Sequence, residues 1–510
     1  MRRILVGALL AALLVPAGLL FAGGTTEGAA ATSSAPQSFT IFAYFRQQQM
    51  SETDKALFAE AEKANNVVIK WETPPSSSYA ERLQLMMAGG NYPEVVLFDS
   101  TADRIYLDGI KNGAIIGISK YLKYMPFFQK YSYKESWDSF KVMGTDEIYG
   151  LPRTSIARAD GYYVRKDWLT NLKVANPEGR AIDMQELNDL LKAFTRSDPD
   201  QNGKADTWGF GPSTDSAGNM GPIFAASFGM VGWQKYTGDD YPYMNLQYSR
   251  KNDAYKRSLA HTAQLWKDGY IDPDWPVVKG EQAIQRFKQG VTGMQGAFAG
   301  WTYQYVQDMT KINPKVELTY VTAVKSPEGK LVAQGAFGTG TWGVWAVTSS
   351  VSDANAQKIF STIDWFLSDQ GWEVTKYGPA GLMYTQQGGT RTPTDKYSTD
   401  VWIRNMFRRN NDPEFFIPLN IPPAMQTTVK GWLQACIDQA QFSLDKGYRP
   451  PVADDPKFID YAKVMSQAIS KIVTGAQPAS SWDEVLDGWY KAGGEQYMKQ
   501  MNEFIAKTAK

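Results

Sequence analysis

Short, largely apolar runs alternate with longer amphipathic runs over the sixty residues that follow the N-terminal segment. The runs at 38–45 (SFTIFAYF), 67–73 (VVIKWET) and 93–100 (PEVVLFDS) are strand-like, and the first and third are typical of strands buried on both faces. Between them, 53–66 carries apolar residues at helical spacing, and 79–90 is a helix closed by two glycines. This alternation predicts a doubly wound α/β domain.

A polar stretch near residue 150 changes this pattern and indicates that the chain crosses into a second lobe. Helices are expected there at 184–196 and 253–269, and the run 331–350 predicts strands that return to the first lobe. The last hundred residues are mainly amphipathic helices. We therefore predict lobe 1 over 38–149, lobe 2 over 150–320, a return to lobe 1 over 321–385, and the completion of lobe 2 with C-terminal helices over 386–510.

The N-terminal segment MRRILVGALLAALLVPAGLLFAGG has two arginines, an apolar run and a small-residue end. It predicts a signal peptide over 1–24 and a linker over 25–37. An apolar stretch of about 18 residues could also be a membrane anchor, but the small residues and the Thr/Ser/Ala/Gly linker favour cleavage. The single cysteine, Cys436, lies in an expected helix, so we expect no intramolecular disulfide and no lipid anchor on a thiol. The mature chain is expected to be soluble in the periplasm or outside the cell.

Charge and composition then exclude several classes of function. Basic and acidic residues number 53 each, so no summed field would attract nucleic acid, and 43% hydrophobic residues are enough to build more than one core. The only histidine, His261, lies on an expected helix, and one His with one Cys builds neither a catalytic triad nor an ordinary zinc site. The GTGTWG stretch at 338–343 lacks the helix and the acid of a dinucleotide site. Carboxylates remain plentiful and could serve glycoside hydrolysis.

Aromatic residues make up 13% of the chain, and many stand in glycine-rich or polar loops. A flat aromatic ring beside polar side chains suits a sugar ring, which has an apolar C–H face and hydroxyl groups around its edge. The alternative is that most of these aromatics are core, and that the charged residues among them are helix caps or surface ion pairs. Ligands of open α/β sheets bind beyond the carboxyl ends of strands. With both indications we predict a ligand site drawn from Tyr44, Phe45, Arg46, Asp99, Ser100, Arg153, Tyr163, Trp233, Trp301, Trp342 and Phe416.

The stretch DPDQNGKADTWG at 198–209 has the oxygen-ligand order of an EF-hand loop. The predicted calcium ligands are Asp198, Asp200, Asn202, the carbonyl of Lys204, and Asp206, with Thr207 or water completing the shell. Gly209 stands at the twelfth position, where a sensor has a bidentate glutamate, and the segment that follows is not helical. The loop therefore predicts a structural calcium site rather than a reversible sensor, with an empty polar turn as the alternative.

Several segments resemble one family in order and spacing: ERLQLMMAGGNYPEVVLFDS, EIYGLPR with YYVRKDWL, DPDQNGKADTWGF, LWKDGYIDPDW and IDWFLSDQGWEVTKYGPAGLMY. Over roughly 38–505 the chain resembles the extracellular solute-binding proteins, family 1, of carbohydrate ABC importers, in the branch with lipoprotein sugar-binding and alginate-binding periplasmic proteins. The alginate-binding proteins hold a structural calcium in this loop, with an acidic residue where this chain has Thr207.

The resemblance implies two α/β lobes joined by a hinge, with an interlobe cleft and a helix-rich C-terminal region. It also implies capture of an oligosaccharide or related glycoside and its delivery to membrane permease subunits, by a monomer that is not an enzyme. A secreted glycoside hydrolase or polysaccharide lyase is the alternative function, and capture of a peptide or an acidic uronate is a third.

Overall fold

The computed structural model describes residues 35–45, 49–142, 145–155, 160–215, 217–335, 340–397, 402, 406–409 and 411–508. The predicted signal peptide, the linker up to residue 34, and Arg46 lie outside these residues. Within the described part, no helix combines the length and the apolar character that a membrane crossing requires.

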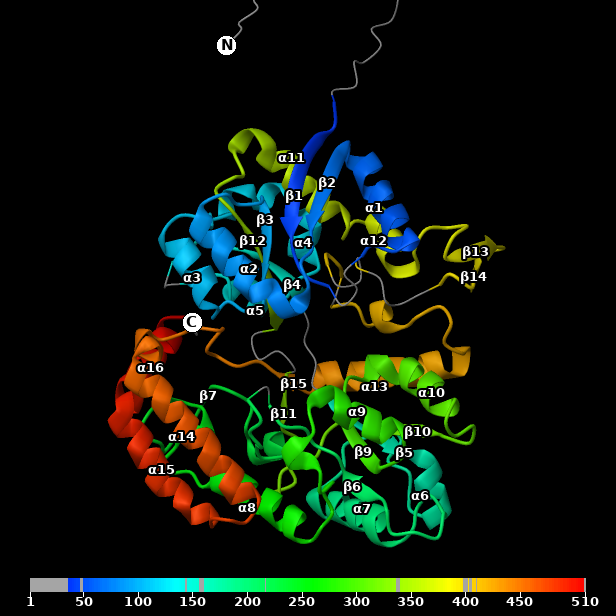
Figure 1. Ribbon diagram of the computed structural model, residues 1–510, viewed down its shortest axis with the longest axis vertical. Helices are drawn as coiled ribbons and strands as arrows, with labels where there is room; N and C mark the ends of the chain where they lie inside the picture. The colour runs from blue at the N-terminus through cyan, green and yellow to red at the C-terminus, as the bar shows by residue number, and fades with distance from the viewer. Residues whose placement is uncertain are drawn as a thin grey trace, which may run out of the picture. The chain divides into compact units, whose positions relative to one another are not determined.

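The first sheet has five strands in the order β2 (Val67–Glu72), β1 (Gln37–Phe42), β3 (Val95–Phe98), β12 (Thr341–Val347) and β4 (Leu151–Ser155). Strands β1, β2 and β3 are parallel, while β12 runs antiparallel to both β3 and β4. Figure 1 shows that β12, although far along the chain, completes the sheet that the blue N-terminal strands begin. Because β12 is antiparallel, its start lies at the edge where β1, β3 and β4 end.

Apolar faces of the surrounding helices bury this sheet. All four residues of β3 are fully buried, as expected for a strand covered on both faces. The core extends to Trp402 and Phe407, and the ring centroids of Phe45 and Trp402 lie 4.5 Å apart. The elements around the sheet are α1 (Glu52–Asn65), α2 (Ser76–Gly89), α3 (Arg104–Lys111), α4 (Pro126–Lys130), α5 (Lys134–Asp138), α11 (Asp353–Trp365), α12 (Asp369–Tyr377) and the hairpin of β13 (Tyr384–Gln387) and β14 (Thr390–Pro393).

The second sheet has four strands in the order β10 (Leu318–Val321), β5 (Gly161–Arg165), β9 (Thr292–Ala297) and β6 (Trp208–Phe210). Strand β5 is antiparallel to both β9 and β10, so its start lies beside their ends. Helix α7 (Met184–Arg196) packs on this sheet and has the bounds predicted from the sequence.

C-terminal helices join the second sheet in one larger core, which contains Trp168, Trp275, Trp482 and Trp489 as large buried side chains. The other elements of this lobe are α6 (Lys166–Leu172), β7 (Gln234–Lys235), β8 (Tyr243–Met244), α8 (Ala254–Lys267), α9 (Gly280–Lys288), α10 (Thr302–Thr310), β11 (Ala333–Gln334), α13 (Pro423–Asp438), β15 (Ala440–Gln441), α14 (Pro456–Val473), α15 (Trp482–Trp489) and α16 (Glu495–Thr508).

The chain passes from the first sheet to the second between Ser155 and Gly161. It returns between Gln334 and Thr341, and Phe407 still belongs to the first core. Strand β4 still belongs to the first sheet, and Trp402 and Met406 pack on the first core with Phe407. The exact limits of the lobes stay a prediction.

Candidate functional site

The first polar group of the candidate site lies at the edge where β1 and β3 end. Tyr44 follows β1 by two residues, and Asp99 follows β3 directly. The Tyr44 hydroxyl donates a hydrogen bond to Asp99 Oδ1 at 2.5 Å. The carboxyl ends of two parallel strands thus bring together side chains that are 55 residues apart in the sequence.

Arg153 on β4 and Trp342 on β12 complete this edge. The guanidinium carbon of Arg153 lies 4.2 Å from the centroid of the Trp342 ring and 5.8 Å from that of Tyr44. Arg153 is 6% exposed, whereas Trp342 keeps 38% of its surface exposed. A side chain at Gly343 would place its Cβ 2.9 Å from Arg153 Cδ, so the glycine leaves the space in which Arg153 lies.

The protonation states of this cluster follow from its burial. Burial, with the hydrogen bond to Asp99 and the charge of Asp99, raises the pKa of Tyr44 to about 12, so the phenol stays protonated and can donate. Burial lowers the pKa of Arg153, while Tyr44 and Asp99 oppose the shift, and a guanidinium stays charged in any case. The edge therefore brings together a partly exposed indole, an exposed carboxyl group and a largely buried cation.

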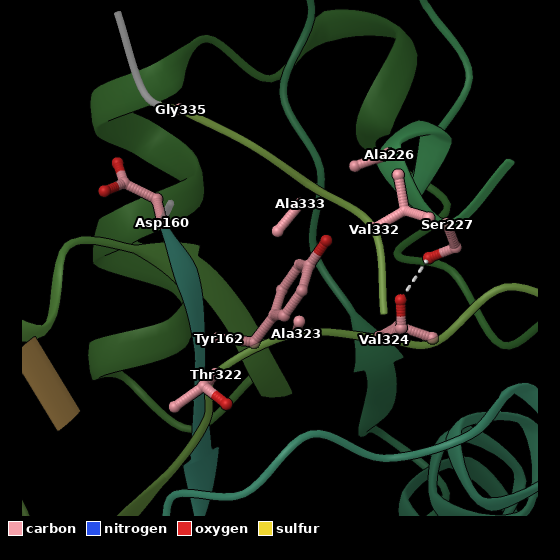
Figure 2. Close-up of a pocket in the computed structure, with 10 residues that line it drawn as sticks. All are labelled: Asp160, Tyr162, Ala226, Ser227, Thr322, Ala323, Val324, Val332, Ala333 and Gly335. Carbon is pink, nitrogen blue, oxygen red and sulfur yellow. Dashed lines mark hydrogen bonds between the residues drawn. The ribbon is translucent and has the colours of Figure 1, made fainter. Parts of the chain in front are cut away.

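A cavity of about 320 Å³ lies at the corresponding edge of the second sheet, where β5 begins and β10 ends. Figure 2 shows the Tyr162 side chain extending into the group of lining residues, and Ser227 Oγ donating to the Val324 carbonyl oxygen at 3.0 Å. This volume lies within the range of small-molecule sites in proteins. The lining residues are Asp160, Tyr162, Ala226, Ser227, Thr322, Ala323, Val324, Val332, Ala333 and Gly335.

The cavity and the first edge adjoin the same passage of the chain. Only residues 156–160 separate the end of β4 from the start of β5, so the two strand ends lie within about 20 Å of each other. Trp301, which is 45% exposed, follows β9 at the end nearest the start of β5. Its ring lies edge-on to Phe298, as does that of the half-buried Phe416.

Three of the residues predicted for the site are buried in the cores instead. Phe45 stacks on Trp402, and Trp233 is 3% exposed and packs near Tyr497 of α16. Tyr163 is fully buried, and its hydroxyl donates to the Phe298 carbonyl oxygen at 2.7 Å. We therefore leave Phe45, Tyr163 and Trp233 out of the proposed site.

Two other predicted positions add little to the site. Ser100 is exposed, and its hydroxyl accepts a hydrogen bond from the Ala102 amide. Arg46 lies outside the described residues.

Alternation along a strand places the two adjacent tyrosines of β5 on opposite faces of the sheet. Neighbouring residues of a strand face opposite sides, so Tyr162 lines the cavity and packs on Phe210 and Phe224, while Tyr163 is buried on the other face against Tyr320. The pair of adjacent tyrosines was visible in the sequence as YYVRKDWL, but nothing in that run set which one faces the core. Asp160 and Tyr162, which line the cavity, were not among the residues predicted for the site.

His261 is packed in the second lobe, where its ring lies 5.6 Å from that of Phe228. Its Nε2 lies 3.1 Å from Asn188 Oδ1, and burial lowers its pKa to about 4. The imidazole is therefore neutral near pH 7 and lies between helices α7 and α8 as part of the structure.

The loop at 198–209 follows helix α7 and folds around its own acidic side chains. The amides of Asn202 and Gly203 donate to the two carboxylate oxygens of Asp198, at 3.1 and 3.0 Å. The Asn202 side-chain amide donates to Asp200 at 2.8 Å and to Asp206 at 3.2 Å. Within the described residues, no group of three or more His, Cys, Asp or Glu side chains is arranged to hold a metal ion.

The donor set of the loop nevertheless has features that suit a calcium ion. Asp200 Oδ1 is buried and has no hydrogen-bond partner among the described residues. Burial and the nearby carboxylates of Asp198 and Asp206 raise the pKa of Asp200, and a bound cation would favour its charged form. Rotation of the Asn202 amide would present its oxygen in place of its nitrogen.

The end of the loop differs from what the sequence pattern predicts. The Thr207 side chain is buried and its hydroxyl donates to the Phe194 carbonyl oxygen at 2.8 Å, so it points to α7 and not toward the acidic cluster. At Gly209 an added Cβ would lie 2.7 Å from both Cα and O of Leu191. A glutamate therefore does not fit at this twelfth position, because the chain there packs directly on the backbone of α7.

Two α/β lobes linked by repeated passages, with aromatic and polar side chains at the strand ends beside a passage, define a two-lobe binding protein. The chain belongs to the bacterial extracellular solute-binding proteins, whose family model matches residues 56–380. The prediction of the family is confirmed, as is that of a binding protein in place of a hydrolase or lyase.

Similar proteins extend over nearly the whole chain. It is 24% identical over 515 residues to the polygalacturonan/rhamnogalacturonan-binding protein YtcQ of Bacillus subtilis, with 97% of each chain covered. It is 26% identical over 274 residues to the fructooligosaccharide ABC transporter substrate-binding protein FusA of Streptococcus pneumoniae, covering 48% of this chain and 49% of FusA. The predicted function, that of a substrate-binding component of an ABC importer, agrees with these relatives.

Solved structures confirm the fold class. The alginate-binding protein AlgQ2 without calcium ion matches with a TM-score of 0.65 and 18% identity, over 93% of this chain and 99% of AlgQ2. FusA in complex with kestose matches with a TM-score of 0.64 and 17% identity, over 92% and 99%. A further match is an EF-hand mutant of FusA.

Proposed function

We propose that this chain captures an oligosaccharide at the strand ends beside the first passage and delivers it to the permease subunits of an ABC importer. The observation that carries the proposal is the packing of the Arg153 guanidinium on the partly exposed Trp342 indole, beside the Tyr44–Asp99 hydrogen bond. The indole offers a flat face to the C–H side of a sugar ring. Arg153 and Asp99 offer a donor group and an acceptor group to its hydroxyls.

The cavity at Tyr162 and the exposed Trp301 extend the proposed site onto the second lobe. Two surfaces on different lobes suit a ligand longer than one sugar ring. The relatives named for polygalacturonan/rhamnogalacturonan, alginate and fructooligosaccharide binding support an oligosaccharide as the ligand. The positive charge of Arg153 would also suit the carboxylate of a uronate, so the ligand could be an acidic or a neutral oligosaccharide.

A panel of oligosaccharides tests this proposal. The panel should contain pectin-derived and alginate-derived uronides, fructooligosaccharides and neutral glucans, each mixed with the wild-type protein. At least one class should raise the melting temperature and change the tryptophan emission, because Trp342 loses contact with water on binding. If no glycan changes either signal, the oligosaccharide proposal fails.

We also propose a structural calcium ion in the loop at 198–209. The ligands would be side-chain oxygens of Asp198, Asp200, Asn202 and Asp206 and the carbonyl oxygen of Lys204, with water where Thr207 turns away. The ion would supply the positive charge that the acidic cluster lacks, and would fix the end of α7. This proposal is supported by the buried oxygen of Asp200.

Removal of calcium by EDTA should lower the melting temperature of the wild-type protein by about 5 °C, from the linkage expected at one hundred times Kd. The double variant Asp198→Ala/Asp200→Ala is the matched control, and its melting curve should not respond to EDTA. Ligand binding should persist in EDTA, because the proposed metal ligands are separate from the residues of the proposed ligand site. Identical wild-type melting curves with and without EDTA would contradict the proposed calcium site.

We further propose that the chain is exported by cleavage of the segment 1–24 and acts as a monomer in the periplasm or outside the cell. The two arginines, the apolar run and the small residues of this segment support export.

A further inference from the structure

The short helix α5 contacts both passages between the sheets. The backbone N–H of Tyr133 donates to Ser155 Oγ at 2.7 Å, at the end of β4 and directly before the first passage. Ser136 Oγ donates to the Gly340 carbonyl oxygen at 2.7 Å, directly before β12 and after the second passage. One helix of the first lobe therefore holds the two points at which the chain leaves and re-enters that lobe.

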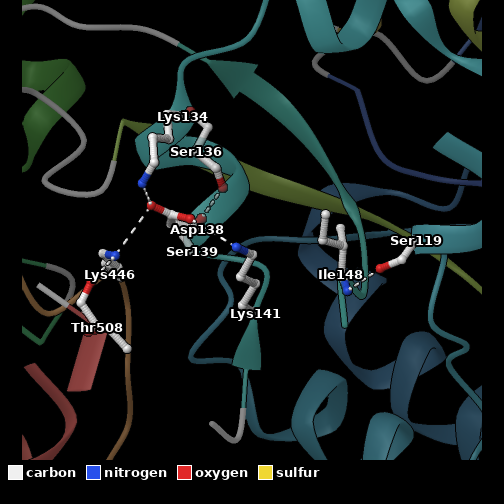
Figure 3. A network of polar contacts seen from close by, with 9 residues as sticks. All are labelled: Ser119, Lys134, Ser136, Asp138, Ser139, Lys141, Ile148, Lys446 and Thr508. Atoms are coloured by element: carbon white, nitrogen blue, oxygen red, sulfur yellow. Dashed lines mark hydrogen bonds and ion pairs between the residues drawn. The ribbon is translucent and has the colours of Figure 1, made fainter. Parts of the chain in front are cut away.

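The same helix also contacts the C-terminal part of the second lobe. Asp138 Oδ2 lies 3.3 Å from Lys446 Nζ, and Lys446 Nζ donates to the Thr508 carbonyl oxygen at 2.9 Å (Figure 3). The rings of Tyr133 and Phe442 lie 6.1 Å apart beside this contact. Lys446 thus joins α5 to the end of α16, which packs in the core of the second lobe.

Burial sets this contact apart from the many exposed ion pairs of the protein. The side chains of Asp138 and Lys446 are 10% and 17% exposed. Burial disfavours the charged carboxylate, but the hydrogen bonds and charges of Lys134 and Lys446 outweigh it and hold the pKa of Asp138 below its ordinary value. Lys134 lies on the same helix as Asp138 and is 79% exposed, so its side chain can adjust when Asp138 moves. The Lys446 side chain cannot adjust as freely, because it also donates to the Thr508 carbonyl oxygen.

A rotation of the two lobes about the passages would change the two distances that Lys446 Nζ makes, to Asp138 Oδ2 and to the Thr508 carbonyl oxygen. Since Arg153 lies on β4 and Trp342 on β12, α5 also touches the segments that carry the proposed ligand site. A substitution at this contact would therefore change ligand affinity by changing the relative position of the two lobes, although the substituted residue does not contact the ligand.

We propose that Asp138, Lys446 and the Thr508 carbonyl form an intramolecular latch that restrains the arrangement of the two lobes. Its effect on ligand affinity rests on the proposed function, but the restraint itself does not. The latch is tested on the ligand-free protein, so its failure and that of the proposed function can be told apart.

The test is a distance distribution between spin labels on two introduced cysteines, Lys63→Cys on α1 and Lys471→Cys on α14, both at exposed positions. The native Cys436 is buried and should not react. In the full exported chain, Lys446→Met should widen or shift the distribution, because the lobes lose their restraint. Lys446→Arg should restore the wild-type distribution.

Two further variants serve as controls. Lys463→Met removes a lysine whose ion pair with Asp460 lies within α14, and it should leave the distribution unchanged. Asp138→Asn should act in the same direction as Lys446→Met, and melting curves should show that each variant is folded. The latch is wrong if Lys446→Met and Asp138→Asn, both folded, give the wild-type distribution, or if Lys463→Met widens it equally.

Discussion

Replacing Trp342 with alanine should weaken oligosaccharide binding about thirtyfold, equivalent to about 2 kcal/mol. The substitution removes the indole that is 38% exposed, and with it the surface on which the Arg153 guanidinium lies. Isothermal titration with the glycan identified by the panel measures the loss.

Two variants sharpen this prediction. Trp342→Phe keeps an aromatic face and should lose only a few-fold in affinity. Arg153→Met removes the charge but keeps much of the stem, and it should weaken a uronide more than a neutral glycan of the same length. A Trp342→Ala protein that melts like the wild type and binds with unchanged Kd would remove this edge from the ligand site.

Replacing Gly209 with glutamate should destabilise the protein by more than 3 kcal/mol, although it restores the usual twelfth residue of an EF-hand loop. The added Cβ would lie 2.7 Å from the Leu191 backbone in α7, and a backbone atom cannot move aside as a flexible side chain can. Urea unfolding measures the free energy, and calorimetry with calcium should show no gain in affinity.

Gly203→Ala in the same loop is the matched control for this effect. Gly203 has φ +79° and open space around an added Cβ, so only the left-handed backbone opposes alanine, at about 1 kcal/mol. A Gly209→Glu protein with wild-type stability and tighter calcium binding would show that the loop end is free to move and to coordinate.

The sequence predicted which strand ends meet at one edge of the first sheet better than it predicted which way the strand side chains face. Tyr44 and Asp99 follow strands that are rich in apolar residues, and their place at the carboxyl ends could be inferred from the α/β pattern. The run SFTIFAYF has no alternation to set its phase, however, so the exposed-edge residue Tyr44 and the core residue Phe45 could not be told apart.

Contacts between distant segments account for the other differences. Trp233 stands in a glycine-containing loop that resembles an exposed one, but Tyr497, more than 250 residues later, packs beside it. The position of β12 between β3 and β4, antiparallel to both, could not be predicted either, because nothing within 341–347 specifies its neighbouring strands. The sequence likewise placed Thr207 beside the predicted metal ligands, whereas its bond to Phe194 depends on how the loop returns to α7.

The most direct test of the central claim is a calorimetric titration of the wild-type protein with each glycan of the panel, followed by chromatography of the mixture. Saturable binding of one oligosaccharide per chain is expected, with recovery of that oligosaccharide unchanged. No measurable binding of any glycan, or recovery of shortened products, would contradict it.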